Sequence, residues 1–354
     1  MQSENEREND SAIVGKQVLV TGASGFTGGR LCRRLVERGY AVRALIRHPD
    51  RDCGLSSSGV EIVLGDLRDQ RSLQRAVDGI DKVLHIAAVY RKENVSRREM
   101  FEINVQGTRN ILDASIKAGV RRFMHCSTTG VHGDIKHPPA NEESPFAPGD
   151  HYQESKAEGE RVVMEYMRNN QLPIVIFRPG GIYGPGDLRF LKLFKAIKAR
   201  RFAMIGSGEV RNQLIYIDDL IDGILLCATA ERAIGNVYIL AGSEPATLNQ
   251  LVHLIAQILE VQPTRLRIPF TPVYLAGFLC EMICKPLGLD PLLHRRRVKF
   301  FSNTRWFDIS KAKTQLGFKP RIDFRIGLDC TAKWYQEQVF LCCAVAAFLS
   351  LVFF

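Results

Sequence analysis

The stretch VLVTGASGFTGG, residues 18–29, decides the fold of this chain. Its first three residues are apolar and predict a buried parallel strand. The glycines Gly22, Gly25 and Gly28 then open a helix over residues 29–39, whose apolar side chains share one face. At such a turn, free N–H groups and the helix dipole point to one place, so the stretch predicts an anion site that a pyrophosphate can approach. A glycine-rich turn without a ligand is the alternative, and the flanking strand and helix weaken it.

The composition indicates a globular protein. With 354 residues, 45% of them hydrophobic, the chain is long enough for one large α/β unit and a smaller lobe. Lys and Arg number 48 and Asp and Glu 38, a formal charge of +10. That excess suits anionic ligands or an anionic membrane surface, and its scatter along helices predicts no nucleic-acid partner. Nine dispersed cysteines predict reduced thiols in the cytosol and no metal site.

The two ends of the chain differ. Residues 1–14 are polar and charged, which predicts a disordered lead-in and no targeting peptide. Residues 339–354 carry no charge, and a helix there would be about 24 Å long, short of the roughly 30 Å hydrocarbon core. Because no polar face remains for solvent, we expect a hydrophobic tail, 336–354, that attaches a cytoplasmic protein to a membrane. A C-terminal helix packed on the core is the alternative.

The second predicted strand, residues 40–47, bears on the choice of dinucleotide. It ends in Arg47 and carries no carboxylate. At this place an acidic residue favours NAD, whereas an arginine accommodates the 2′-phosphate of NADP. The sequence therefore predicts NADP, with NAD as the alternative and with Arg47 as the phosphate partner. A solvent-facing arginine is the competing interpretation.

Two further predicted strands complete this half. After residues 61–64, Asp66 and Leu67 lie where adenine would rest, and the Asp66 carboxylate could accept from an exocyclic amine or cap the helix that begins near residue 68. The strand over residues 82–88 ends in small residues, including Ala87, that let the chain pass under a flat cofactor. His85 within it is predicted to be a hydrogen-bonded core residue.

Chemistry is indicated by a hydroxyl-bearing strand and a Tyr–Lys pair. Ser127 and Thr128 belong to the strand predicted over residues 122–130, whose C-terminal end is where doubly wound sheets place their sites. Tyr152 and Lys156 are four residues apart on a predicted helix and so share one face. A lysine ammonium beside a phenol favours the phenolate, which can then exchange a proton with an alcohol or ketone. Such pairs are common on surface helices, so the order of the motifs carries the inference.

Together these motifs resemble the extended short-chain dehydrogenase/reductase family, also called the NAD-dependent epimerase/dehydratase superfamily. The resemblance covers about residues 15–335. It rests on TGASGFTG at 21–28, GDL at 65–67, NVQGT at 104–108, Ser127 with Thr128, YQESK at 152–156 and RPGGIYGPGD at 178–187. It implies an α/β fold, a doubly wound parallel (Rossmann) sheet with a smaller C-terminal substrate lobe.

The resemblance also implies roles for single residues. Tyr152 would be the acid/base, and Lys156 would tune it and hold the nicotinamide ribose. Thr128 falls at the family's Ser/Thr position, with Ser127 beside it, and Asn104 would support the active-site water and the lysine. The expected cofactor-binding residues are Gly22, Ser24, Gly25, Phe26, Gly28, Arg47, Asp66, Leu67, Ala87, Lys156 and Pro179. His132 departs from the tyrosine frequent in the family.

Within the family, the later sequence resembles the 3β-hydroxysteroid and sterol-4α-carboxylate 3-dehydrogenase and dihydroflavonol-reductase-like branch. RRRVKFF at 295–301 and WFDISKA at 306–312 carry this likeness. The Arg-Pro-Gly-Asp element with which many epimerases hold a nucleotide diphosphate is absent from the C-terminal lobe. Residues 268–284 are strongly apolar between arginines, so they line a lipophilic pocket, lie on a membrane, or form a packed lobe helix.

These observations predict a layout and a reaction. The dinucleotide-binding domain covers 15–180 with 213–240 returning to it, and the substrate lobe covers 181–212 and 241–335. The expected reaction is hydride transfer between a nicotinamide and a lipophilic secondary alcohol or ketone. A sugar-nucleotide epimerase or dehydratase that retains NAD(P) and a non-catalytic nucleotide-sensing scaffold are the alternatives. The resemblance implies a homodimer, which nothing in the residues themselves shows.

Overall fold

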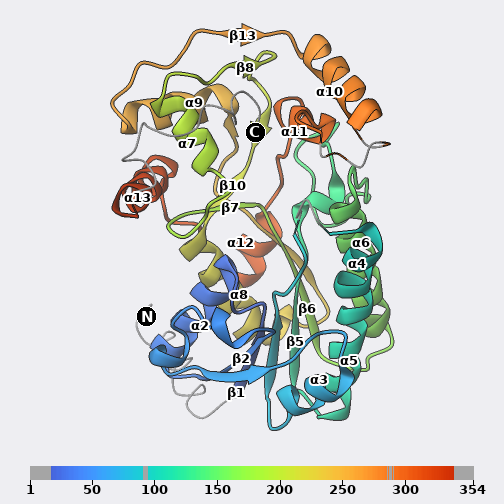
Figure 1. Cartoon of the computed structure of the whole chain (residues 1–354). Helices are drawn as coiled ribbons and strands as arrows, with labels where there is room; N and C mark the ends of the chain where they lie inside the picture. The colour runs from blue at the N-terminus through green and yellow to red at the C-terminus, as the bar shows by residue number, and fades with distance from the viewer. Residues whose placement is uncertain (1–16, 91–94, 285, 287–288, 290, 339–354) are drawn as a thin grey trace.

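A seven-stranded parallel sheet forms the centre of the computed structural model, which describes residues 17–338 except 91–94, 285, 287, 288 and 290 (Figure 1). The strand order is β11-β6-β5-β4-β1-β2-β3. The strands are β1 (Gln17–Thr21), β2 (Ala41–Ile46), β3 (Glu61–Leu64), β4 (Lys82–His85), β5 (Arg122–Cys126), β6 (Ile174–Pro179) and β11 (Val237–Leu240). The order reverses between β1 and β4, and such a reversal opens a crevice at the carboxyl ends of the strands. The predicted fold class is confirmed.

Helices cover both faces of the sheet because alternate side chains of its strands point to opposite sides. Val18 and Val20 of β1 share a hydrophobic cluster with Leu31 of a helix on one face. Leu19, between them, belongs to a second cluster with Leu73 on the other face. The first face carries α2 (Phe26–Glu37) and α8 (Ile217–Thr229), and the second carries α3 (Gln70–Val77), α5 (Gly107–Lys117) and α6 (His151–Arg168).

The rest of the chain forms a smaller lobe above the carboxyl ends of the strands (Figure 1). Its short strands pair as three two-stranded sheets, β7–β10, β9–β12 and β8–β13. They are β7 (Gly181–Tyr183), β8 (Met204–Ile205), β9 (Arg211–Asn212), β10 (Leu214–Tyr216), β12 (Ala246–Thr247) and β13 (Arg267–Ile268). The helices here and at the sheet edge are α7 (Leu191–Lys198), α9 (Leu248–Ile258), α10 (Phe270–Cys284), α11 (Arg295–Val298), α12 (Ser310–Leu316) and α13 (Phe324–Glu337).

Residues 213–240, predicted to return to the dinucleotide-binding domain, pair with both parts of the molecule. β11 forms the edge of the main sheet, parallel to β6. β10 pairs with β7 of the smaller lobe instead. α8, which connects β10 to β11, packs against β5 and β6. The predicted boundaries of the domains remain predictions.

Several local predictions differ from the structure. The predicted helix over residues 101–112 consists of α4 (Arg97–Phe101), a π-helical turn (Glu102–Gln106) and α5. In the wide turn, the Asn104 carbonyl accepts a hydrogen bond from the Thr108 hydroxyl at 2.8 Å. Of the two roles left open for Asp66, the helix cap is contradicted, because α3 begins at Gln70 and the Asp69 side chain caps it.

Two predicted strands are shorter than expected, and the chain ends lie outside the description. β4 stops at His85, and β5 stops at Cys126 because the Thr128 side chain caps a short helical turn that follows. The predicted lead-in, 1–14, and the charge-free tail, 339–354, fall outside the described residues. In the described part of the chain, no helix has the length and apolar character needed to cross a membrane.

Candidate active site

The glycine turn after β1 leaves the N-terminus of α2 open. Gly22 has φ +71°, and a Cβ there would lie 2.7 Å from the backbone of Ala87. A Cβ on Gly28 would lie 2.2 Å from the Gly22 carbonyl oxygen, so neither position tolerates a side chain. The N-cap residue is Gly25, no side chain among residues that the structure describes caps this helix, and its first turn holds no carboxylate. The free N–H groups therefore fit an anionic diphosphate.

One cavity of about 1460 Å³ extends from this turn to the lobe. Most of the residues expected to bind the cofactor line it: Gly22, Ser24, Gly25, Phe26, Gly28, Arg47, Asp66, Leu67, Ala87 and Pro179. Three of the five expected catalytic residues, Ser127, Thr128 and Tyr152, line the same cavity, whereas Lys156 and Asn104 do not. The crevice at the strand reversal thus collects residues that are far apart in the chain.

The adenosine end of the cavity carries two arginines and one carboxylate. Arg47 directly follows β2 and is exposed, and Arg51, which sequence reasoning missed, also lines the cavity. Its position four residues after Arg47 was the available signal. Asp66 accepts hydrogen bonds from the Arg68 guanidinium at 2.7 and 3.0 Å. These bonds lower the pKa of Asp66, which keeps its carboxylate ionised as an acceptor.

The two candidate hydroxyls after β5, those of Ser127 and Thr128, have different partners. The Thr128 hydroxyl oxygen accepts a hydrogen bond from the Gly130 N–H at 3.0 Å, so its own hydrogen remains available to a ligand. The buried Ser127 hydroxyl donates its hydrogen to the Glu160 carboxylate. Of the two candidates, Thr128 is therefore the one that can donate into the cavity.

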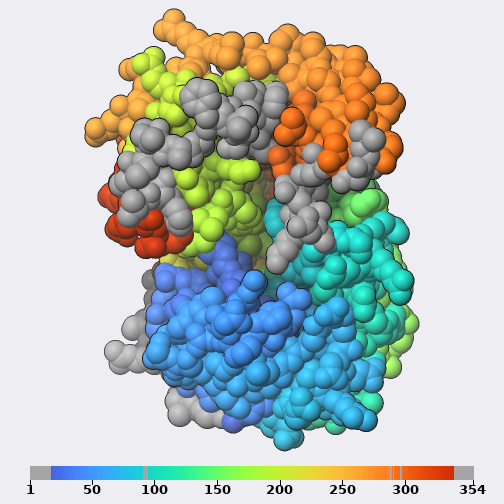
Figure 2. Space-filling model, in the orientation of Figure 1, coloured from blue at the N-terminus to red at the C-terminus, as the bar shows by residue number. Residues whose placement is uncertain are grey.

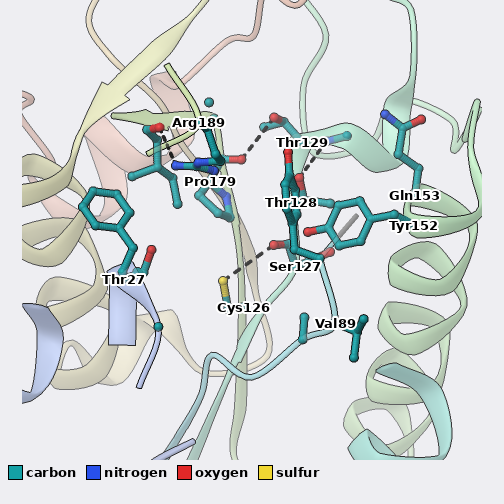
Figure 3. A pocket seen from close by; sticks show the side chains of 18 of the residues that line it. Thr27, Val89, Cys126, Ser127, Thr128, Thr129, Tyr152, Gln153, Pro179 and Arg189 are labelled. Carbon is teal, nitrogen blue, oxygen red and sulfur yellow. Dashed lines mark hydrogen bonds between the residues drawn. The ribbon is translucent and has the colours of Figure 1, made fainter. Parts of the chain in front are cut away.

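Tyr152 lies in the first turn of α6, which the Asp150 side chain caps by accepting from the Gln153 N–H. Figure 3 shows its ring projecting from the helix toward Ser127 and Thr128. The ring of Tyr90 meets it edge-on, with 4.9 Å between the ring centroids. The cap and this ring contact together fix the direction in which the phenol points.

Lys156 follows one turn later and is buried behind the cavity wall. Its ammonium donates to the Cys126 carbonyl at 2.6 Å. Burial lowers its pKa, and the neighbouring Cys126 and Glu160 oppose that shift. The hydrogen bond from Lys156 to Cys126 holds the end of β5 against α6.

Asn104 also lies outside the cavity lining and connects three elements. Its amide oxygen accepts from the Val89 N–H at 2.7 Å, and its amide nitrogen donates to the Val89 carbonyl at 3.2 Å. The same nitrogen donates to the Ser155 hydroxyl at 2.9 Å, next to Lys156. Asn104 thus ties the segment after β4 to α6.

Arg189 is the largest omission of the sequence-based prediction. It donates to the Asp187 carboxylate and to the Ile182 carbonyl, each at 2.7 Å. Its guanidinium lies 5.8 Å from the ring centroid of Phe26 and 5.8 Å from that of Tyr90. It therefore spans the cavity between the glycine turn and the Tyr152 side, and its place two residues after the conspicuous 178–187 motif was the only signal.

The lobe supplies the remaining lining. Phe270 and Tyr274 of α10 stack with 5.5 Å between ring centroids, and Phe300 lies beyond α11. Lys299 and Arg305 bring positive charge to the same end of the cavity. The sequence marked this region as similar to a known branch, but local patterns could not say which of its side chains point inward.

A buried ion pair supports Ser127 from behind. The Arg178 guanidinium donates to the Glu160 carboxylate at 2.6 Å, and its other terminal nitrogen lies 3.1 Å from His132 Nε2. Both charged side chains are almost fully excluded from solvent. Sequence reasoning missed Glu160, although its spacing from Lys156 is one helical turn.

A dinucleotide crevice joined to a hydroxyl, tyrosine and lysine site defines an NAD(P)-dependent oxidoreductase or epimerase. Residues 18–241 match the NAD dependent epimerase/dehydratase family. This chain belongs to that family, so the predicted family is confirmed.

Relatives of this chain act on different molecules. The sterol demethylase protein B of Methylococcus capsulatus (Bath) is 30% identical over 336 residues, which cover 90% of this chain and 98% of that protein. The N-acetyl-alpha-D-glucosaminyl-diphospho-ditrans,octacis-undecaprenol 4-epimerase of Escherichia coli O157:H7 is 30% identical over 321 residues, 90% of this chain and 94% of that protein. Among solved structures, the dTDP-glucose 4,6-dehydratase DesIV of Streptomyces venezuelae, with NAD bound, has a TM-score of 0.73 at 26% identity, covering 91% of this chain and 97% of that one.

Proposed function

We propose that this protein is an NADP-preferring oxidoreductase that acts on a lipophilic secondary alcohol or ketone of the 3β-hydroxysteroid or sterol kind. One observation carries the proposal: a single cavity joins the open helix N-terminus and Arg47 to Thr128 and Tyr152, and then to the aromatic wall of the lobe. The likeness to a sterol demethylase protein supports the substrate class.

The chain's own residues have distinct parts in the proposed reaction. A nicotinamide bound beside Pro179 would give or take the hydride. Tyr152 gives its hydroxyl proton to the ketone oxygen, or takes it back from the alcohol. Thr128, whose hydroxyl hydrogen is available, donates to the same oxygen. Lys156, one helical turn from Tyr152, adds positive charge that favours the phenolate.

The preference for NADP rests on charge at the end of β2. Arg47 and Arg51 both line the cavity. A guanidinium binds phosphate through charge-assisted hydrogen bonds, which the 2′-hydroxyl of NAD does not match in strength. The carboxylate of Asp66 is held by Arg68, which reduces its repulsion of a nearby phosphate.

An epimerase that retains its NAD(P) is the second candidate function. Lys136, Lys299 and Arg305 line the cavity, and cationic side chains of this kind suit the diphosphate of a sugar nucleotide. The likeness to an epimerase of a lipid-linked sugar diphosphate also supports it. A scaffold without chemistry is less well supported because Tyr152 and Thr128 face the same cavity.

Purified protein should be mixed with NADPH and either a sterol 3-ketone or a UDP-sugar, while absorbance and products are followed. The proposal predicts net NADPH oxidation with the ketone, faster than with NADH. Conversion of the UDP-sugar without NADPH consumption, together with inertness toward the ketone, would show that the epimerase alternative is correct.

A further inference from the structure

Helix α10 has its polarity reversed. Its buried stripe consists of Val273, Gly277 and Glu281, so its single charged side chain faces inward. Glu281 is 7% exposed and accepts hydrogen bonds from Arg295 of α11. An ordinary surface helix buries its apolar side and exposes its charged side. Because Glu281, the one charged residue of α10, is paired with Arg295 inside the lobe, the outward side of α10 carries no charged side chain.

The outward side of α10 is apolar from Leu275 to Ile283. The exposed large side chains are Leu275, Phe278, Leu279, Met282 and Ile283. Leu279 is 45% and Ile283 60% exposed, although such exposed positions of a surface helix are usually occupied by polar residues. Leu266 before the helix and Leu292 after it are exposed as well, at 58% and 86%. Figure 2 shows α10, in orange, on the outer surface at the upper right of the molecule. A contiguous apolar surface with a polar rim marks a site of contact with a protein or a membrane.

Charge distinguishes these two partners. Arg265 and Arg267 before α10 and Lys299 after it are exposed. Glu281 is the only acidic residue between positions 261 and 289, and it is turned inward. Two copies of this surface would bring their like charges together, whereas anionic lipid headgroups complement them. A helix of 15 residues is about 22 Å long, too short to cross a hydrocarbon core of roughly 30 Å, so it fits the plane of the interface.

We propose that α10 lies in the surface of an anionic lipid membrane, with its apolar side in the acyl region and its basic flanks among the headgroups. Phe270 and Tyr274 of the same helix line the cavity. The cavity therefore opens beside the membrane contact, and a lipophilic substrate passes from the bilayer along α10 toward Tyr152. The membrane contact stands by itself, and only this delivery route rests on the proposed function.

The test uses the full chain with vesicles of phosphatidylcholine mixed with phosphatidylglycerol. Leu279→Gln combined with Ile283→Gln makes the apolar side polar at positions outside the cavity lining. Leu64→Gln combined with Ile326→Gln is the matched control, since these residues are 49% and 56% exposed on β3 and α13. The α10 variant should lower vesicle partition by about tenfold or more, and the control should not.

Amide hydrogen exchange in residues 270–284 reports on α10 itself, because attachment through another part of the chain would not slow exchange there. Vesicles should slow exchange there in the wild type and the control, but not in the α10 variant. Unchanged exchange at 270–284 in sedimented wild-type protein would overturn the proposal. A homodimer that the α10 substitutions dissociate, in the absence of lipid binding, would also overturn it.

Activity separates this proposal from the proposed function. With a water-soluble cyclic ketone and NADPH, the α10 variant should keep wild-type turnover, because neither substituted residue lines the cavity. Its rate should fall only with a sterol ketone presented in vesicles. A protein that oxidises no NADPH with any ketone contradicts the proposed function and leaves the vesicle result as it stands.

Discussion

The Glu160 carboxylate and the Arg178 guanidinium form an ion pair at 2.6 Å, with side chains 0% and 1% exposed. The pair orders its neighbours. Because Arg178 can only donate, His132 Nε2 must accept, so the His132 proton lies on Nδ1, 3.2 Å from the Pro145 carbonyl. Ser127 gives its hydrogen to Glu160. The ion pair therefore fixes both ends of the segment 127–132, which contains Thr128.

The different partners of the two hydroxyls predict different defects. Thr128→Val removes the hydroxyl that can donate into the cavity, so kcat for ketone reduction should fall by about a hundredfold to a thousandfold. Thr128→Ser should restore most of that loss. Ser127→Ala should affect stability more than kcat. Steady-state kinetics with NADPH check this, and equal losses in the Ser127 and Thr128 variants would refute the assignment.

Arg47 should set the preference for NADP. Arg47→Ala removes a charge-assisted bond to the 2′-phosphate, so the Kd for NADP should rise by about tenfold or more while the Kd for NAD changes little. Isothermal titration of both dinucleotides measures this. Arg71→Ala, on the exposed side of α3, is the matched control and should change neither value. If the unaltered protein binds both dinucleotides equally, Arg47 has no such role.

Breaking the buried Glu160–Arg178 ion pair should strongly lower the free energy of unfolding. Glu160→Gln leaves Arg178 without its counter-charge, and urea unfolding should show a loss of about 3–5 kcal/mol. Glu158→Gln, which breaks the exposed pair with Arg161 on the same helix, should cost about 1 kcal/mol or less. Replacing both members of the buried pair, Glu160→Leu with Arg178→Met, should recover part of the stability. Equal effects of the Glu160 and Glu158 variants would contradict this account.

Two buried histidines predict instability in mild acid. Burial lowers the pKa of His85 to about 3 and that of His125 well below its usual range, and in each case the charge of Lys156 adds to this. The unfolded chain, with histidine pKa values of about 6.5, therefore binds protons first as the pH falls. The stabilisation is complete above about pH 6.5 and declines below it, by about 1.4 kcal/mol for each histidine at about pH 5.5.

Urea unfolding at about pH 7.5 and about pH 5.5 measures that loss. His125→Leu should remove the share of that loss that His125 causes, about 1.4 kcal/mol, and leave the shares of His85 and of the buried His132, whose pKa is also lowered. Leucine can replace this ring because neither ring nitrogen of His125 has a hydrogen-bond partner in the described structure. A loss of stability between the two pH values as large in the His125 variant as in the wild type would contradict this assignment.

The local sequence pattern was enough to predict the features that depend on residues close together in the chain. Gly22 and Gly28 follow from the strand–turn–helix pattern, and their close backbone contacts confirm why they are glycine. His85 is a hydrogen-bonded core residue as predicted, between the hydroxyls of Thr21 and Thr108. The parallel sheet follows from alternating apolar strands and amphipathic helices.

Features that depend on distant contacts could not be predicted in this way. Asp69 took the helix cap expected of Asp66 because a shift of three residues leaves the local signal almost unchanged. Arg189 reaches across the cavity to Phe26 and Tyr90, a relation that exists only once the lobe has folded over the sheet. The reversed polarity of α10 depends on Glu281 finding Arg295 on another helix.

The most direct test of the proposed function is a transfer of label. NADPH carrying deuterium at both C4 positions is mixed with the protein and a sterol 3-ketone, and the product alcohol is analysed by mass spectrometry. The wild type should place deuterium on the carbinol carbon with one NADPH consumed for each alcohol formed, and Tyr152→Phe should reduce the rate at least about a hundredfold. Absence of deuterium from any sterol product, while a UDP-sugar is converted without net NADPH consumption, would contradict the account.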